Sequence, residues 1–374
     1  MRYRSLRRST SLAALILTVG QVPAWAEVPA VVTDMPVTHS LVSMVMGELA
    51  APELLLDRGA DPHHFQLRPS QARAVSQAGL AVWMGPELAP WMARAVGSLA
   101  GGASLELLEV DGIDLQPFRE SRLTGAAREH AHSHDHDHDH DHDHDHDHDH
   151  DHEDHAHHHG EHNQDHGHEH TDWEHGHDDH NHDHGSDHVD EHGHHDHHHG
   201  DADPHAWMNP QNAAPWLTAI AGALAELDPG NAEAYRTNAA QWVERIAALE
   251  VEVAEILAPV GDAGLIMYHD AYGYLATAFG LNVLGTIALG DAADPGAARI
   301  TAIRASLREA GAVCVFPEAN HPDAYIALIS EAEDGLRVGG ALDPEGVMLE
   351  PGVDLYPTLM REMATAIAEC VAGD

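Results

Sequence analysis

The chain of 374 residues contains no lysine, so all 18 of its basic residues are arginines. This absence excludes the enzymes that need a P-loop lysine for phosphate or a lysine that forms a Schiff base. Against the 18 basic residues stand 62 acidic ones, which give a formal net charge of −44 at pH 7. A protein of this charge repels nucleic acid and anionic membranes, so we expect neither as a partner.

Long apolar runs are also scarce, and the clearest one, residues 12–19, lies near the start of the chain. It is too short to span a membrane, which takes about 20 apolar residues. Arginines precede it within residues 2–8, and Ala24-Trp25-Ala26 follows it as a small-x-small pattern. This order is typical of a secretory signal peptide, which we place at residues 1–26. We therefore expect the mature protein in a periplasm, with no insertion into the membrane.

Only two cysteines are present, Cys314 and Cys370. In an exported protein an even pair favours a disulfide, because the compartment is oxidising. A bridge over a loop of this length stabilises a fold by about 4 kcal/mol in the chain-entropy model. The alternative is a pair of thiolate ligands to a metal, but these cysteines lack the close spacing of a zinc knuckle.

Histidine, in contrast, is abundant. All but six of the 38 histidines lie between His130 and His199, where they alternate with aspartate over many residues. A segment with almost no apolar residues cannot bury a core, so we expect a disordered insertion over residues 129–200. Neutral imidazole suits zinc, copper and nickel. We therefore predict several weak, auxiliary metal sites along this histidine-rich tract.

The rest of the chain alternates short apolar runs with segments of helical periodicity. Runs at residues 80–84 and 105–110 precede the tract, and runs at 265–268 and 313–316 follow it. Strands that alternate with helices in this way predict mainly parallel sheets flanked by helices. The expected fold class is α/β, with one lobe on each side of a long helix.

That helix is predicted from apolar residues between Tyr235 and Ile256, which recur at steps of three and four and form one stripe. Asp228 and Pro229 before them are typical of an N-cap and a first helical residue. A coiled-coil dimer is the alternative, but the stripe is only about four heptads long. The predicted domains are an N-terminal lobe of residues 27–128 and 201–228, a linking helix of residues 229–258, and a C-terminal lobe of residues 259–374.

Three histidines outside the tract are candidates for a metal site. His63 and His205 each follow an Asp-Pro pair, and His269 follows the apolar run at residues 265–268. In open α/β sheets ligands bind beyond the carboxyl ends of strands, where His269 is expected. Three imidazoles that converge between the lobes make a zinc site with a fourth position for water or a carboxylate. An isolated histidine is as often an ordinary hydrogen-bonded residue, and spacing alone does not decide between these roles.

The segments around these histidines resemble the periplasmic zinc-binding proteins of ABC importers, the ZnuA type. The resemblance covers nearly all of the mature chain apart from the tract, and its segments occur in the family's order. They are residues 59–70 (GADPHHFQLRPS), 205–210 (HAWMNP), 268–274 (YHDAYGY) and 314–316 (CVF).

The resemblance implies two α/β lobes joined by one long helix, with zinc between them. It implies His63, His205 and His269 as the metal ligands, and the last of these favours zinc because manganese-binding relatives carry an acidic residue there. Asp343 matches an aspartate that coordinates metal in some relatives, while water is the rival fourth ligand and a turn before Pro344 is its ordinary role. Cys314 and Cys370 match a disulfide seen in this type of protein.

We therefore expect a monomeric binding protein, not an enzyme, that captures Zn²⁺ in the periplasm and delivers it to an ABC permease in the membrane. The tract then acts as an auxiliary that collects zinc. One alternative is an exported protein for zinc storage or buffering, in which the tract itself is the function. The other is an exported zinc hydrolase, with Glu318 as general base toward a metal-bound water. Glu318 is also a candidate to support a ligand histidine.

Overall fold

The structure, a computed structural model, describes residues 28–119, 202–288, 295–331 and 334–373. The predicted signal peptide at residues 1–26 and the histidine-rich tract lie outside the described residues, so both stay predictions. Within the described parts of the chain, no helix is long and apolar enough to cross a membrane.

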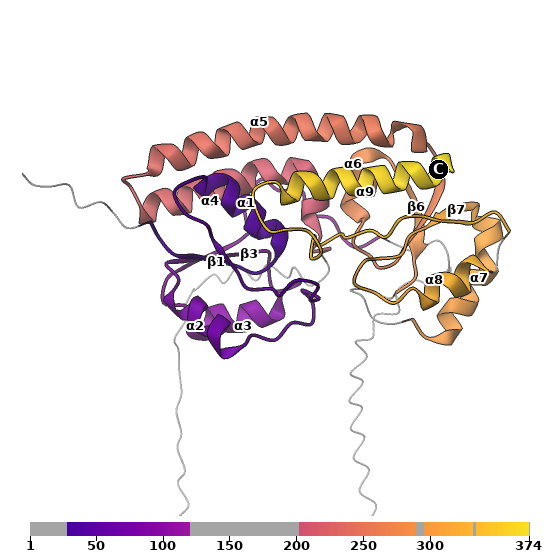
Figure 1. Ribbon diagram of the computed structural model, residues 1–374, viewed down its shortest axis with the longest axis horizontal. Helices are drawn as coiled ribbons and strands as arrows, with labels where there is room; N and C mark the ends of the chain where they lie inside the picture. The colour runs from indigo at the N-terminus through magenta and orange to yellow at the C-terminus, as the bar shows by residue number, and fades with distance from the viewer. Residues whose placement is uncertain (1–27, 120–201, 289–294, 332–333, 374) are drawn as a thin grey trace, which may run out of the picture. The chain divides into compact units, whose positions relative to one another are not determined.

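The N-terminal lobe is built on a parallel sheet in the order β2-β1-β3-β4. Its third strand in the chain is buried along its whole length, as expected for a strand covered by helices on both faces. The strands are β1 (Val31–Thr33), β2 (Glu53–Leu54), β3 (Leu80–Trp83) and β4 (Ala103–Glu106). The helices are α1 (Pro36–Met46), α2 (Pro69–Gln77), α3 (Pro90–Leu99) and α4 (Ala213–Leu227) (Figure 1).

The C-terminal lobe repeats this plan with a second parallel sheet in the order β6-β5-β7-β8. The predicted disulfide is confirmed, since Cys314 on β7 is bonded to Cys370 on α9. The strands are β5 (Gly264–Met267), β6 (Asn282–Thr286), β7 (Ala312–Val315) and β8 (Arg337–Val338). The helices are α6 (Gly273–Phe279), α7 (Ala297–Ala310), α8 (Ala324–Ser330) and α9 (Leu355–Ala372).

Strand β5 shows how the second sheet is sandwiched. Leu265 and Met267 pack into the main hydrophobic core, while Ile266 and Tyr268 pack into a separate core on the other face. The alternation follows from the two-residue period of a strand. The main core also contains residues of β1, α1 and α9, so it is shared by both lobes.

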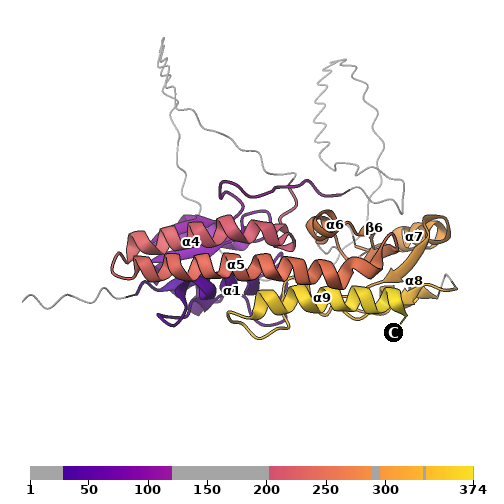
Figure 2. The ribbon, with the colours of Figure 1, turned by 90° about the horizontal axis from the view of Figure 1, so that it is seen from above.

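The long helix α5 (Ala232–Leu257) packs along α1, α4 and α9 (Figure 2). Its buried stripe includes Tyr235, in agreement with the predicted periodicity. The predicted start of the helix at Pro229 is wrong. Asp228 instead ends α4, because its N–H donates to the carbonyl of Leu224. The Asp228 side chain accepts a hydrogen bond from the Tyr235 hydroxyl. Pro229 lies in the turn between α4 and α5.

The two chain segments that flank the undescribed residues 120–201 lie side by side. Pro117 and Ala202 form an antiparallel bridge, and the N–H of Asp203 donates to the carbonyl of Gln116 at 2.8 Å. The hydroxyl of Tyr274, on α6, accepts from the N–H of Gln116 and donates to the carbonyl of Asp203. We call this arrangement of residues 116–117 and 202–203 the neck, and it fixes the chain just before His205.

Candidate metal centre

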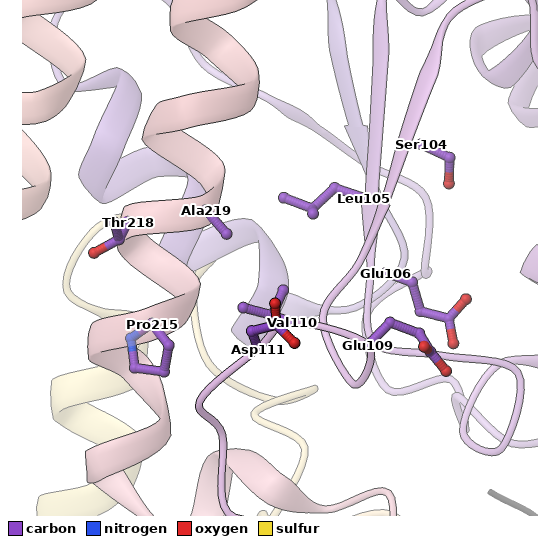
Figure 3. Close-up of a pocket in the computed structure, with 9 residues that line it drawn as sticks. All are labelled: Ser104, Leu105, Glu106, Glu109, Val110, Asp111, Pro215, Thr218 and Ala219. Atoms are coloured by element: carbon purple, nitrogen blue, oxygen red, sulfur yellow. The ribbon is translucent and has the colours of Figure 1, made fainter. Parts of the chain in front are cut away.

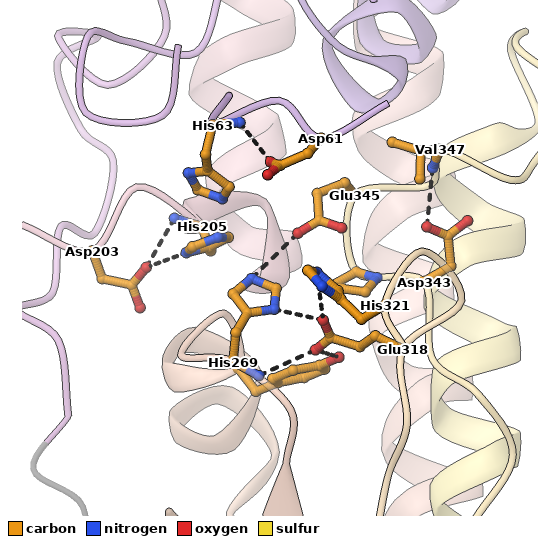
Figure 4. A network of polar contacts seen from close by, with 12 residues as sticks. Asp61, His63, Asp203, His205, His269, Glu318, His321, Asp343, Glu345 and Val347 are labelled. Atoms are coloured by element: carbon orange, nitrogen blue, oxygen red, sulfur yellow. Dashed lines mark hydrogen bonds and ion pairs between the residues drawn. The ribbon is translucent and has the colours of Figure 1, made fainter. Parts of the chain in front are cut away.

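Four buried side chains converge in the described part of the chain: His63, His205, His269 and Glu345 (Figure 4). Each offers one ligand atom, and these atoms all lie within 4.8 Å of one another. His205 and His269 are fully buried, while His63 is 8% and Glu345 2% exposed. Three imidazole nitrogens and one carboxylate oxygen are a donor set that zinc takes in a tetrahedral site.

His63 and His205 are presented by the same local device. Asp61 Oδ1 accepts the N–H of His63 at 2.8 Å, and Asp203 Oδ1 accepts the N–H of His205 at 3.0 Å. In each case the aspartate bonds the backbone two residues on, which is an Asx-turn, and the proline between fixes its own φ. The Asp-Pro-His pattern therefore aims an imidazole from a loop that belongs to neither a helix nor a strand.

Asp203 also orients the ring of His205. Its Oδ1 lies 2.7 Å from Nδ1 of the imidazole, and both side chains are fully buried. When this carboxylate accepts a hydrogen bond from Nδ1, Nε2 is the ring nitrogen that could hold a metal.

His269 is held in the same way from the edge of the second sheet. It follows β5, and its Nδ1 lies 2.7 Å from Oε2 of Glu318, which follows β7. The other oxygen of Glu318 accepts the hydroxyl of Tyr272 at 2.8 Å. Because β5 and β7 are neighbouring parallel strands, their carboxyl ends bring ligand and support together. Glu318 therefore has the supporting position that the sequence suggested as one of its roles.

The ligand side of His269 faces Glu345. Its Nε2 lies 3.3 Å from Oε1 of that carboxylate. Burial by itself lowers the pKa of His269, but the carboxylates of Glu318 and Glu345 outweigh it and raise the pKa well above its usual value. Burial acts to raise the pKa of Glu345, yet its hydrogen bond and charge interaction with His269 lower it to about 2. The two shifts have one cause, the close approach of the imidazole to a buried carboxylate.

His63 has the opposite character. Burial, and then the nearby imidazoles of His205 and His269, lower its pKa to about 2. The imidazole therefore stays neutral at any physiological pH, which is the form that binds a metal.

The predicted fourth ligand, Asp343, lies outside this cluster. Its two carboxylate oxygens accept the N–H groups of Val347 at 3.0 Å and Met348 at 2.9 Å, and Figure 4 shows the group turned toward Val347. Asp343 thus has the turn role that the sequence offered as its alternative, and Glu345 takes the place next to the histidines. The sequence contained a signal for this, because Asp343-Pro344-Glu345 repeats the Asp-Pro pattern of the two histidine segments.

A hollow elsewhere on the N-terminal lobe has a different chemistry (Figure 3). It has a volume of about 760 Å³ and lies between β4 with the segment after it and α4. Glu106, Glu109 and Asp111 are among its lining residues, which include no histidine. Burial, and then the charges of Glu109 and Glu87, raise the pKa of Glu106 to about 7. A wall of carboxylates without imidazole is not a zinc site of the kind described above.

Two parallel α/β lobes around a long helix, with three buried histidines and a carboxylate between them, define a bilobal metal-binding protein. Comparison with known proteins places it further: the family described as "Zinc-uptake complex component A periplasmic" matches residues 31–370. The chain belongs to this family, ZnuA, and both the predicted resemblance and the predicted fold class are confirmed.

Curated relatives agree with this assignment, and solved structures share the fold. The chain is 45% identical to the high-affinity zinc uptake system protein ZnuA of Paracoccus denitrificans, over 99% of this chain and 100% of the relative. It is 38% identical to that of Brucella suis, over 91% of each chain. Among solved structures, a crystal structure of ZnuA has a TM-score of 0.61 at 18% identity, covering 91% of this chain and 98% of the other. FpvC of Pseudomonas aeruginosa in complex with Mn²⁺ has a TM-score of 0.63 at 17% identity, with coverages of 92% and 98%. At these identities the structures support the fold alone.

Proposed function

We propose that this protein captures Zn²⁺ in the periplasm with His63, His205, His269 and Glu345, and delivers it to an ABC permease for uptake. The observation that carries the proposal is the convergence of three buried imidazoles and one buried carboxylate. Membership of the ZnuA family, and relatives named for high-affinity zinc uptake, support both the metal and its transport.

The donor set favours zinc among the common divalent cations. Magnesium, calcium and manganese prefer sites made mostly of oxygen ligands, whereas imidazole suits zinc. Carboxylates on Nδ1 of His205 and His269 strengthen both imidazoles as donors and fix their orientation.

The same donor set favours binding over catalysis. Catalytic zinc sites keep an open position for water, while four protein ligands close the tetrahedron. In the hydrolase alternative Glu318 takes a proton from metal-bound water. Its oxygens are instead engaged by His269 Nδ1 and the Tyr272 hydroxyl, on the side of the imidazole opposite the cluster.

The origin of the ligands suggests how the metal is held and released. His63 and His205 come from the N-terminal part of the chain, and His269 and Glu345 follow strands of the second sheet. A bound zinc ion therefore ties the two lobes together, so its release requires at least one ligand to withdraw. The histidine-rich tract, in this proposal, raises the local concentration of zinc through weak and exchangeable binding.

Calorimetric titration with zinc of the intact chain, and of a chain that lacks residues 131–199, tests this function. We expect one tight site to survive the deletion, while the weaker binding events disappear. The variants His63→Ala, His205→Ala and His269→Ala should each lose the tight site. If the deletion abolishes tight binding, storage in the tract is the better interpretation. If the zinc-loaded protein hydrolyses ester or lactam substrates, the protein is an enzyme.

A further inference from the structure

The loop that carries Glu345, residues 343–350, lies against the N-terminal segments that carry two of the histidines. The indole N–H of Trp207, just after His205, donates to the carbonyl of Pro344 at 2.9 Å. The N–H of Gly59, just before the His63 turn, donates to the carbonyl of Val347 at 3.0 Å. We call residues 343–350 the Glu345 loop. One hydrogen bond holds the start of this loop beside His205, and the other holds its middle beside the His63 segment.

A third fastening lies at the outer end of the loop and is made by Arg58. Its guanidinium donates to the carbonyl of Met348 at 2.7 Å and pairs with the carboxylate of Glu350. The side chains of Arg58 and Glu350 are 58% and 82% exposed, whereas Trp207 is fully buried. The inner contact is thus protected from water, and the outer one is open to it.

The loop itself is cross-braced, so its two ends are mechanically linked. The Asp343 carboxylate accepts the N–H groups of Val347 and Met348 across the turn. Gly346, which lies inside this turn, has φ +71°. A Cβ atom added at this position would meet the side chains of Leu355 and Leu359 at 3.0 Å. A turn braced in this way moves as one piece, so displacement of the Met348 end also displaces the carboxylate of Glu345.

His205 and His269 have no comparable dependence on an exposed contact. His205 is held by the buried Asp203 and His269 by the buried Glu318. The backbone around Glu345 is anchored on one side by the buried Trp207, and on the other side by the Gly59 N–H and the exposed Arg58. The position of Glu345 therefore depends in part on an exposed contact, whereas the positions of His205 and His269 do not.

We propose that Arg58 is a positioning residue that holds the Glu345 loop against the N-terminal lobe, and so sets the rate at which bound zinc is released. The inference rests on the proposed function, because it concerns the same four-ligand site. Arg58 touches neither the metal nor its ligands, and it acts through the loop.

The test is the rate of zinc loss from the full chain to an excess of a chelator, after loading with half an equivalent of zinc so that the tightest site fills first. Loss of an exposed ion pair together with a charged hydrogen bond should accelerate release about five- to tenfold in Arg58→Ala. Arg361→Ala is the matched control, since Arg361 also forms a partly exposed ion pair, with Glu252 on α5. It should release zinc within about twofold of the parent rate, because this pair joins α9 to α5 and does not hold the Glu345 loop.

Two further variants separate positioning from a general loss of structure. Arg58→Glu combined with Glu350→Arg restores an ion pair of reversed polarity and should recover part of the parent rate. In a Glu345→Ala background, Arg58→Ala should add no further acceleration, because the ligand that it positions is gone. An acceleration of equal size in that background would overturn the proposal, as would a parent-like rate for Arg58→Ala alone. Failure of the parent chain to bind zinc tightly would instead refute the proposed function.

Discussion

Replacement of Glu345 by glutamine provides the sharpest test of the metal centre. Glutamine keeps the size of the side chain and one carbonyl oxygen, but removes the negative charge next to His269. The carboxylate is almost fully buried, and its Oε1 lies 3.3 Å from Nε2 of that histidine. The variant therefore changes the chemistry of one donor. It leaves the three imidazoles and the backbone of the site in place.

The magnitude follows from the number of donors. Four protein ligands bind a structural zinc ion with about 10–16 kcal/mol in total, so one of the four contributes about 3 kcal/mol. Loss of the carboxylate should therefore weaken zinc binding on the order of 100-fold.

Asp343→Asn is the matched control, because Asp343 lies two residues away and was the other candidate ligand. Its carboxylate bonds the N–H groups of Val347 and Met348, and asparagine retains one acceptor oxygen for them. The loss of one such hydrogen bond costs about 1 kcal/mol, so affinity should fall by less than about tenfold.

Both affinities can be measured by competition with a chromophoric chelator at less than one equivalent of zinc, with thermal unfolding of the metal-free proteins as a check of the fold. The assignment of Glu345 is refuted if its glutamine variant binds zinc as tightly as the parent. A 100-fold loss in Asp343→Asn with near-normal binding in Glu345→Gln would reverse the roles of the two carboxylates.

Three other outcomes are expected. The raised pKa of His269 means that zinc must displace a proton from this imidazole, so binding should release a proton and affinity should fall as the pH is lowered through that raised pKa. Calorimetry in buffers of different ionisation enthalpy measures the proton release, and a pH-independent affinity contradicts it. Glu318→Gln should weaken zinc binding about 10- to 100-fold, because the support of the His269 ring loses its charge; an unchanged dissociation constant excludes that support. Reduction of the Cys314–Cys370 bridge, which spans 56 residues, should lower the free energy of unfolding by about 4 kcal/mol in denaturant titrations; equal midpoints for the oxidised and reduced protein contradict this.

The α/β class and the three histidines were accessible from sequence because both depend on local patterns. Apolar runs such as residues 265–268 have the length and burial of strands, and β5 is found at Gly264–Met267. The Asp-Pro pairs before His63 and His205 define turns that need no knowledge of the rest of the fold. Features set by neighbouring residues in the chain are those that a sequence can predict.

The place of Glu345 beside the histidines and the start of the long helix were not predicted, for a different reason. Asp343 and Glu345 are both acidic and both next to Pro344, and only the direction of the turn decides which one faces the histidines. Asp228 has the composition of an N-cap, but the preceding helix α4 uses it as its own end. In both cases two local solutions were available, and tertiary packing selected one of them.

The neck at Pro117 and Ala202 has a consequence for how this protein can change over evolutionary time. The segments on either side of residues 120–201 are hydrogen-bonded to each other and to Tyr274. These contacts set the position of His205 without any contribution from residues 120–201. For a disordered tract of the kind that the sequence predicts, each doubling of length adds only about 0.6 kcal/mol to the cost of closing the loop. Mutation can therefore lengthen, shorten or recompose the insertion at little cost, and leave the geometry of the metal centre to a separate and much stricter selection.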